Sequence, residues 1–247
     1  MQNDQTQKFY TDDSGSYDER WIKKGGRVTN QSQLKLVSEL TTDWQNCKVL
    51  EVGCGSGRFS VPLAKVNPEM ILLDLSDAML QSTLDKVGRS HKGLNASVYE
   101  IPLPDGSVEK VISVNVFNHV EDLPRALSEV NRVLVDGGEF VVNITNLCSY
   151  FWLAGMLVNR KQKSIGREVY SKWLKPGEFL RLLDNCHFVV LETVGNVFVP
   201  IYLDLPIIRE VLFLLDRISR HGLLRWLAPT IFIKCKKSGF LAGGEVR

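Results

Sequence analysis

The chain has 247 residues, of which 44% are hydrophobic and 23% are charged, so it can bury a substantial core without disulfides or a structural metal. Its formal net charge of +2 gives no reason to expect a nucleic-acid partner, because such partners select a concentrated basic face. The five cysteines are scattered and form no Cys-x-x-Cys pair, and no His, Cys and carboxylate cluster has metal-ligand spacing. We therefore expect reduced thiols and no required metal.

The sequence carries no predicted targeting or membrane-spanning segment. Residues 1–17 are polar and lack the apolar core of a signal peptide. No apolar run approaches the roughly 20 residues that a membrane-spanning helix needs. We therefore expect a soluble, cytoplasmic protein.

Hydrophobic periodicity predicts helices and strands in alternation from residue 32 onward. In chain order they are a helix over 32–40, a strand over 48–52, a helix over 59–64, a strand over 70–74, a helix over 78–87, strands over 96–99 and 110–116, a helix over 123–135, a strand over 139–144, a helix over 175–183 and strands over 188–199 and 230–235. The last two strands are separated by about thirty residues with a helical pattern, where a hairpin usually needs about two to five.

Alternating strands and helices predict right-handed crossovers and a parallel sheet covered on both faces. The expected fold is α/β and Rossmann-like: a doubly wound, mostly parallel seven-stranded sheet with helices on both faces and a helical insertion before the last strand. We expect a single domain over 1–247. Its expected parts are an N-terminal cap region over 1–45, a cofactor-binding core over 46–146, and an acceptor-side half over 147–247 that contains the helical insertion over 201–228.

A glycine-rich turn follows the first predicted strand, with Gly53, Gly55 and Gly57 at alternate positions. Glycine at such a turn lets the backbone approach a ligand closely and leaves the amides at the helix N-terminus free to bind it. The second strand ends about twenty residues later at Asp74, where an acid can accept hydrogen bonds from the ribose hydroxyls of an adenosine ligand. The set predicts a cofactor that contains adenosine.

The charge of Glu51, just before this turn, separates two such cofactors. A carboxylate at the end of the first strand would repel the pyrophosphate of a dinucleotide, but it would attract a positively charged amino or sulfonium group. Glu51 therefore favours S-adenosylmethionine over NAD.

Several segments together resemble the motifs of class I S-adenosylmethionine-dependent methyltransferases, in the order and spacing of that family. The resemblance is closest to the branch that contains ubiquinone and menaquinone biosynthesis methyltransferases. The segments are 51–57, 74–79, 101–105, 111–122 and 134–140. The resemblance implies S-adenosyl-L-methionine as the cofactor and methyl transfer as the reaction.

The resemblance also implies roles for single residues. Glu51 would help to hold the amino group of the cofactor, Asp74 would take the ribose hydroxyls, and Leu75 and Met79 would pack against adenine. Residues at the end of the fourth strand would face the sulfonium. The implied cofactor-binding positions are Glu51, Gly53, Cys54, Gly55, Gly57, Asp74, Leu75, Met79, Ser97, Asn115, Val116 and Phe117.

Two positions depart from the family pattern. Ser97 stands where the family often has an aspartate that contacts the adenine amino group, and a hydroxyl accepts that bond more weakly. Asn118 and His119 stand where the family often has two histidines after the fourth strand. His119 is therefore the candidate general base, although a lone histidine before a helix is more often structural. A base is needed only if the acceptor must lose a proton.

Acceptor recognition is expected outside the cofactor motifs. The candidate acceptor-binding residues are Tyr17, Trp21, Tyr150 and Trp152. The segment 203–226 is apolar around most of a predicted helix and must cover something. Four alternatives stay open for it: the sheet edge, a partner subunit, a hydrophobic acceptor beneath a lid, or a membrane surface in peripheral contact. We expect a small quinone-, phenol- or lipid-like acceptor and a monomer or homodimer.

Two other function classes share this pattern. An NAD-dependent oxidoreductase would use the same scaffold, but Glu51 argues against it, as does the lack of a suitably placed Tyr-x-x-x-Lys pair. A non-catalytic cofactor-binding protein of the methyltransferase fold is the second alternative, and the complete glycine motif makes it less favoured.

Overall fold

The computed structural model describes residues 11, 18–22, 24–149, 152, 172–196, 214, 217–218 and 220–239. Tyr17, Tyr150, residues 197–199 of the predicted sixth strand and much of 203–226 lie outside this part of the chain. Within it, no helix combines the length and apolar character that crossing a bilayer requires. Among the described residues, no group of three or more His, Cys, Asp or Glu side chains could hold a metal ion.

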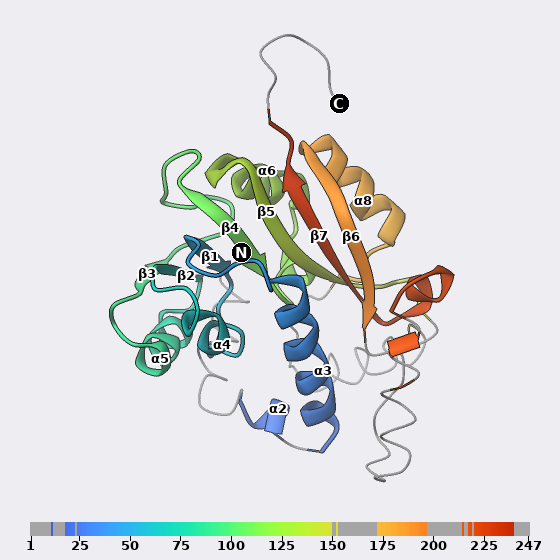
Figure 1. Ribbon diagram of the computed structural model, residues 1–247, viewed down its shortest axis with the longest axis horizontal. Coiled ribbons are helices and arrows are strands. Elements are labelled where there is room, and N and C mark those ends of the chain that lie inside the picture. The colour runs from blue at the N-terminus through green and yellow to red at the C-terminus, as the bar shows by residue number, and fades with distance from the viewer. Residues whose placement is uncertain are drawn as a thin grey trace.

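Seven strands form one sheet in the order β3-β2-β1-β4-β5-β7-β6 (Figure 1). The strands are β1 (Val49–Val52), β2 (Met70–Asp74), β3 (Lys92–Asn95), β4 (Val108–Ser113), β5 (Leu134–Thr145), β6 (Phe188–Asn196) and β7 (Thr230–Lys237). Strands β1 to β5 pair in parallel, whereas β7 runs antiparallel to both β5 and β6. The seven-stranded Rossmann-like sheet is confirmed, and it is a mixed sheet because of β7.

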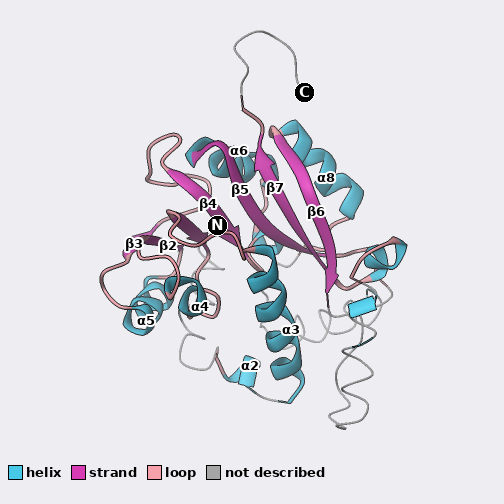
Figure 2. Ribbon diagram, viewed as in Figure 1, coloured by secondary structure: helices cyan, strands magenta, loops and turns pink. Residues whose placement is uncertain are grey.

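Helices cover both faces of this sheet (Figure 2). The helical elements are α2 (Glu19–Ile22), α3 (Lys24–Leu40), α4 (Ser60–Ala64), α5 (Asp77–Val87), η1 (Phe117–His119), α6 (Leu123–Val133), α8 (Pro176–Asn185) and η2 (Leu223–Leu227). Alternate residues of β1 point into two separate cores: Leu50 packs with the α6 and α8 layer, and Val49 packs with the α3, α4 and α5 layer. This alternation explains why the central strands read as continuous apolar runs.

The third strand was predicted over 96–99, and that prediction is wrong. β3 spans Lys92–Asn95 and pairs with β2 from Ile71 onward. A Cβ added at Gly93 would lie 2.8 Å from Cδ1 of Leu84, so the close approach of α5 selects this glycine for the strand. The segment 96–99 instead follows the end of the strand, where its residues line a cleft.

Several helix and strand boundaries also differ from the predicted ones. β4 ends at Ser113 rather than 116, and α3 begins at Lys24 rather than 32. α6 ends at Val133 and β5 begins at the next residue, because Leu134 pairs with Val108 of β4. Of the predicted insertion over 201–228, the described part contains only scattered helical residues and the short 3-10 helix η2.

Candidate functional site

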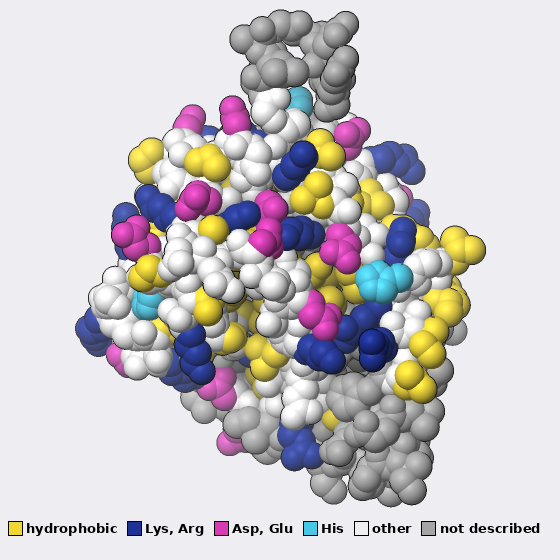
Figure 3. Space-filling view, in the orientation of Figure 1, with side chains coloured by type: hydrophobic (Ala, Val, Ile, Leu, Met, Phe, Trp, Pro, Cys, Tyr) yellow, Lys and Arg dark blue, Asp and Glu magenta, His cyan; other side chains and the backbone are white. Residues whose placement is uncertain are grey.

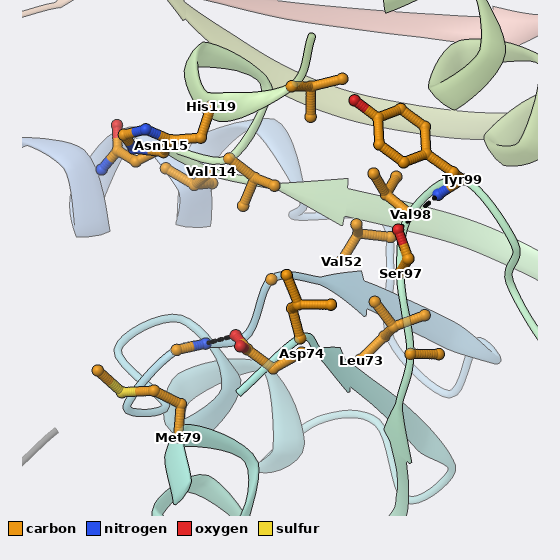
Figure 4. A pocket seen from close by; sticks show the side chains of 16 residues that line it. Val52, Leu73, Asp74, Met79, Ser97, Val98, Tyr99, Val114, Asn115 and His119 are labelled. Atoms are coloured by element: carbon orange, nitrogen blue, oxygen red, sulfur yellow. Dashed lines mark hydrogen bonds between the residues drawn. The ribbon is translucent and has the colours of Figure 1, made fainter. Parts of the chain in front are cut away.

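A cleft opens at the carboxyl ends of β1, β2 and β4, with a volume of about 800 Å³ including its open mouth. Asp74 and Met79 lie on one wall, and Asn115 and His119 lie on the facing wall (Figure 4). The lining residues are Val52, Gly53, Gly55, Leu73, Asp74, Leu75, Met79, Ala96, Ser97, Val98, Tyr99, Val114, Asn115, Val116, His119 and Val120. A mostly apolar cleft with few polar groups is typical of a small-molecule site.

The glycine turn shapes the floor of this cleft. Gly53 has a positive φ of 72°, and its N–H donates to the carbonyl of Leu73 at 2.7 Å. A Cβ added at Gly53 would overlap Cγ2 of Val116, so only glycine lets β1 and the segment after β4 approach this closely. Gly55 also has a positive φ, of 53°, but a Cβ there would meet nothing within 4 Å. The Cα of Gly55 therefore has open space on the side where a side chain would project.

Asp74 ties the end of β2 to the glycine turn. Its Oδ2 accepts from the N–H of Gly55 at 2.8 Å, and its Oδ1 accepts from the N–H of Ser76 at 2.9 Å. Burial raises the pKa of Asp74 above its ordinary value, and the backbone hydrogen bonds offset part of that rise. The two bonds hold the carboxylate in one orientation at the cleft wall, where Figure 4 labels Asp74.

Glu51 does not line the cleft. Its side chain is 3% exposed, and its Oε2 accepts from the hydroxyl of Ser60 in α4 at 2.5 Å. Burial raises the pKa of Glu51 to about 8, the Ser60 bond lowers it, and the nearby charge of Asp74 raises it further. α4 therefore holds the Glu51 carboxyl behind the glycine turn, and its contact with a cofactor amino group stays a prediction.

The other residues expected at the cofactor divide into two groups. Those that line the cleft are Gly53, Gly55, Asp74, Leu75, Met79, Ser97, Asn115 and Val116. Cys54, Gly57 and Phe117 do not line it. Phe117 is fully buried against the rings of Phe140 and Phe179, so its side chain supports the core beneath the cleft. Cys54 lies in the core on the α3 side.

Asparagines shape the wall opposite Asp74. Asn115 has a positive φ of 62°, and it forms a reciprocal pair with the fully buried Asn143, each accepting from the other at 2.6 and 2.8 Å. Asn118 turns its side chain to β5, where its Oδ1 accepts from the N–H of Thr145 at 3.0 Å. Asn118 is thus a structural residue, and of the pair 118–119 only His119 faces the cleft.

Tyr99 is a cleft residue that the sequence did not indicate. Its hydroxyl accepts from the N–H groups of Glu121 and Asp122 at 2.9 and 3.1 Å, just before α6. It therefore joins the loop after β3 to the segment that carries His119. No signal at 96–99 could have shown this, because the segment reads as a strand and the partners are far along the chain.

Of the residues expected to bind an acceptor, the structure describes Trp21 and Trp152. Trp21 lies in α2 beneath the guanidinium of Arg58, with Cζ 3.8 Å from the ring centroid. Trp152 is 38% exposed. Neither lines the cleft, and Tyr17 and Tyr150 lie outside the described residues. The N-terminal part nevertheless reaches the cofactor side, since Lys86 of α5 binds both Asp18, at 2.6 Å, and the carbonyl of residue 56.

Part of the chain matches a known domain family. Residues 50–142 match the family described as a methyltransferase domain. A probable S-adenosylmethionine-dependent methyltransferase of Mycolicibacterium smegmatis is 31% identical over 155 residues, which are 60% of this chain and 54% of that protein. A ubiquinone biosynthesis O-methyltransferase of Pasteurella multocida is 25% identical over 193 residues, which are 70% of this chain and 78% of that protein.

The fold has solved counterparts as well. An S-adenosylmethionine-dependent methyltransferase of Thermotoga maritima, a possible histamine N-methyltransferase, superposes with a TM-score of 0.72 at 22% identity, covering 94% of this chain and 99% of that one. These matches confirm the resemblance to class I methyltransferases, whose cofactor is S-adenosylmethionine. The chain spans about half the length of the Mycolicibacterium relative.

Replacing Gly53 by alanine is expected to destabilise the protein by about 2–4 kcal/mol, because the new methyl group combines left-handed backbone strain with overpacking against Val116. Urea unfolding measures the loss. The double variant G53A/V116A should recover part of it. The control is Gly177→Ala in α8, where a Cβ has open space. A G53A protein as stable as the wild type would show that the close approach is absent.

Glu51→Gln is expected to change how stability depends on pH. The folded-state pKa of Glu51, about 8, lies above its ordinary value of 4.5, so its contribution is fully present below about pH 4.5 and is lost as pH rises through about 8. The variant cannot ionise there, and its stability relative to the wild type should rise by more than about 1 kcal/mol across that range. Urea midpoints at several pH values measure it, with the exposed Glu69→Gln as control. Parallel curves for wild type and E51Q would contradict the assignment.

Proposed function

We propose that this chain, whose residues 50–142 belong to the methyltransferase domain family, transfers a methyl group from S-adenosylmethionine to a small hydrophobic acceptor. The observation that carries the proposal is the Asp74 carboxylate, fixed by two backbone amides at the wall of a largely apolar cleft beside an open glycine turn. The family match supports the methyl donor. The acceptor class is argued from the cleft itself.

The donor set fits the adenosyl half of the cofactor. Each oxygen of Asp74 accepts one backbone N–H and keeps further acceptor capacity for a ribose hydroxyl. Leu75 and Met79 would form the apolar wall beside adenine, and the Ser97 hydroxyl lies along the same cleft. The open backbone face of Gly55 leaves room for the methionine end. Residues that already line the cleft would therefore supply the contacts to the cofactor, and the core would not need to rearrange.

Glu51 would act on the cofactor through its charge rather than by direct contact. The carboxyl is buried behind the turn, where its raised pKa keeps a proton on it near neutral pH. A sulfonium or ammonium group in the cleft would favour the ionised form of Glu51, since opposite charges attract strongly in a medium of low polarity. Cofactor binding would then release a proton from Glu51.

The cofactor would supply an electrophilic methyl group, and the protein's task is to align an acceptor with it and exclude water. Holding two reactants in line can contribute roughly 7–11 kcal/mol. The facing wall of Val114, Val116 and Val120 would exclude water and position an apolar acceptor. The acceptor nucleophile forms the new bond to carbon as the sulfur–carbon bond breaks. His119, which lines the cleft, would take the acceptor's proton where one must leave.

An acceptor with a ring or an apolar tail suits this wall, which supports a quinone-, phenol- or lipid-like compound. The Pasteurella relative is named for ubiquinone biosynthesis, which agrees with that class. The NAD-dependent alternative loses support, because the matching domain is a methyltransferase domain. A protein that binds the cofactor without catalysis is the outcome that an activity screen would reveal.

Asp74→Asn is expected to weaken binding of S-adenosylhomocysteine by about 10–100-fold, because hydrogen bonds to a charged acceptor are worth about 1.5–3 kcal/mol. Titration calorimetry measures the change. The control is Asp77→Asn, an exposed acid three residues further on in α5. Equal affinity of D74N and D77N for S-adenosylhomocysteine would refute the ribose assignment, and a titration of NAD on the same proteins tests the competing cofactor.

His119→Asn is expected to lower kcat by roughly 10²–10⁴-fold for an acceptor that must lose a proton, with little change in S-adenosylhomocysteine affinity. A labelled-methyl screen over quinones, phenols, lipids and amines provides the acceptor for this measurement. His187→Asn serves as the control, because His187 lies in the turn between α8 and β6, away from the cleft, and asparagine tolerates its positive φ of 60°. Unchanged kcat and an unchanged pH profile in H119N would remove His119 from the mechanism.

A further inference from the structure

Large apolar side chains are exposed together on η2. Leu223 is 87% exposed, Leu224 46% and Leu227 45%. Leu214 and Ile218, earlier in the same stretch of chain, are 56% and 60% exposed. Single exposed leucines are ordinary on protein surfaces, but a contiguous group marks an interaction site. We call Leu223, Leu224 and Leu227 the leucine rim.

The backbone of the leucine rim is anchored to the sheet. The Nδ2 of the fully buried Asn146, directly after β5, donates to the carbonyls of Trp226 and Ala228 at 2.7 and 2.8 Å. The N–H of Gly195 in β6 donates to the carbonyl of Arg220 at 3.0 Å. A Cβ at Gly195 would lie 3.0 Å from Cα of Arg225, so this strand packs closely under η2. The leucines therefore project outward from a fixed backbone.

Basic side chains lie beside the rim. A groove between α3 and the segment before η2 contains Lys35, Arg217 and Arg220, of which Arg220 pairs with Glu39 at 2.9 Å. Leu214 lines the same groove. The sequence over 217–229 contains three arginines, one histidine and no acid. Figure 3 shows Lys and Arg side chains gathered next to hydrophobic ones on this side of the molecule.

The leucine rim and the cleft share one edge of the sheet. The cleft is lined by residues that follow β1, β2 and β4 at their carboxyl ends. β7 runs antiparallel to β5, so its first residue, Thr230, pairs with Thr145, the last residue of β5. η2 immediately precedes β7 and is therefore held at the carboxyl edge as well. A surface that received the rim would also face the side on which the cleft opens.

We propose that the leucine rim and the exposed Lys35 and Arg217 of the adjacent groove dock onto a lipid bilayer that carries anionic headgroups. The leucines would enter the boundary between headgroups and acyl chains, while the basic groove would attract lipid phosphates. A second copy of the chain fits this surface less well than an anionic bilayer does, because a two-fold dimer would bring the same basic groups of both copies together. The inference concerns lipid binding by the chain and does not depend on methyl transfer.

Flotation of the full chain with vesicles tests the proposal. One set of vesicles contains phosphatidylcholine alone, and the other contains equal parts of phosphatidylcholine and phosphatidylglycerol. The wild type should float with the anionic vesicles, and less so as salt increases. The variant L223Q/L224Q should lose roughly tenfold or more in partition, because two leucines no longer leave water on binding. Arg217→Gln should weaken binding to the anionic vesicles selectively.

Matched controls lie at the opposite edge of the sheet, in the turn before β2. Val66 is 44% exposed, close to the 46% of Leu224, so Val66→Gln should leave partition unchanged where Leu224→Gln lowers it. Lys65→Gln is the control for Arg217→Gln. Thermal midpoints and S-adenosylhomocysteine binding confirm that each variant is folded. The proposal is overturned if the wild type ignores anionic vesicles, or if L223Q/L224Q floats like V66Q. It also fails if light scattering shows a vesicle-independent dimer that this double variant dissociates, since a second copy would then cover the rim.

Discussion

The hydrogen bond from the Gly55 N–H to the Asp74 carboxylate is the interaction on which the site depends. It joins the turn after β1 to the end of the neighbouring parallel strand β2, and it holds the Asp74 carboxylate beside Gly55. A longer side chain in place of Asp74 would push the carboxylate past the Gly55 amide. A side chain at Gly53 would separate the turn from Val116. The proposed cofactor contacts and the packing of the strands therefore constrain the same few residues.

The two acids of the site differ because their surroundings differ. Asp74 meets several backbone amides, which stabilise its charge in part, whereas Glu51 meets one hydroxyl and a repelling neighbour. A buried carboxyl with one neutral partner keeps its proton more firmly. Under the proposed function, the positive charge of a bound ligand would alter this balance and favour the ionised form of Glu51.

The antiparallel β7 brings a further segment of the chain to the edge of the sheet where the cleft opens. Because β7 begins where β5 ends, the segment that precedes it must lie beside the cleft. Asn146 and Gly195 then bind that segment through its backbone, which leaves its leucines to solvent. A parallel last strand would have placed the same residues at the far edge of the sheet. Strand direction therefore places the basic and apolar surface on the side where an acceptor would enter.

Much of this architecture follows from local rules. The spacing of apolar residues located β1, β2 and the core of α5, and Ser76 caps α5 through its hydroxyl, as its residue type indicates. The glycine turn and Asp74 predicted an adenosyl site because strand ends and glycine backbones act locally. The predicted third strand failed because Lys92–Asn95 has little strand character of its own, and its pairing depends on β2 and on Leu84 packing against Gly93.

The sequence by itself determined the fold class, the place of the glycine turn and the acid at the end of β2, since each depends on neighbours within a few residues or on a regular repeat. Only the tertiary structure decided that Glu51 lies behind the turn against Ser60, that Phe117 belongs to the core, and that Tyr99 reaches Glu121 and Asp122. Those facts depend on which face of an element packs against which partner, and contacts between distant segments leave no periodic signal in a single chain.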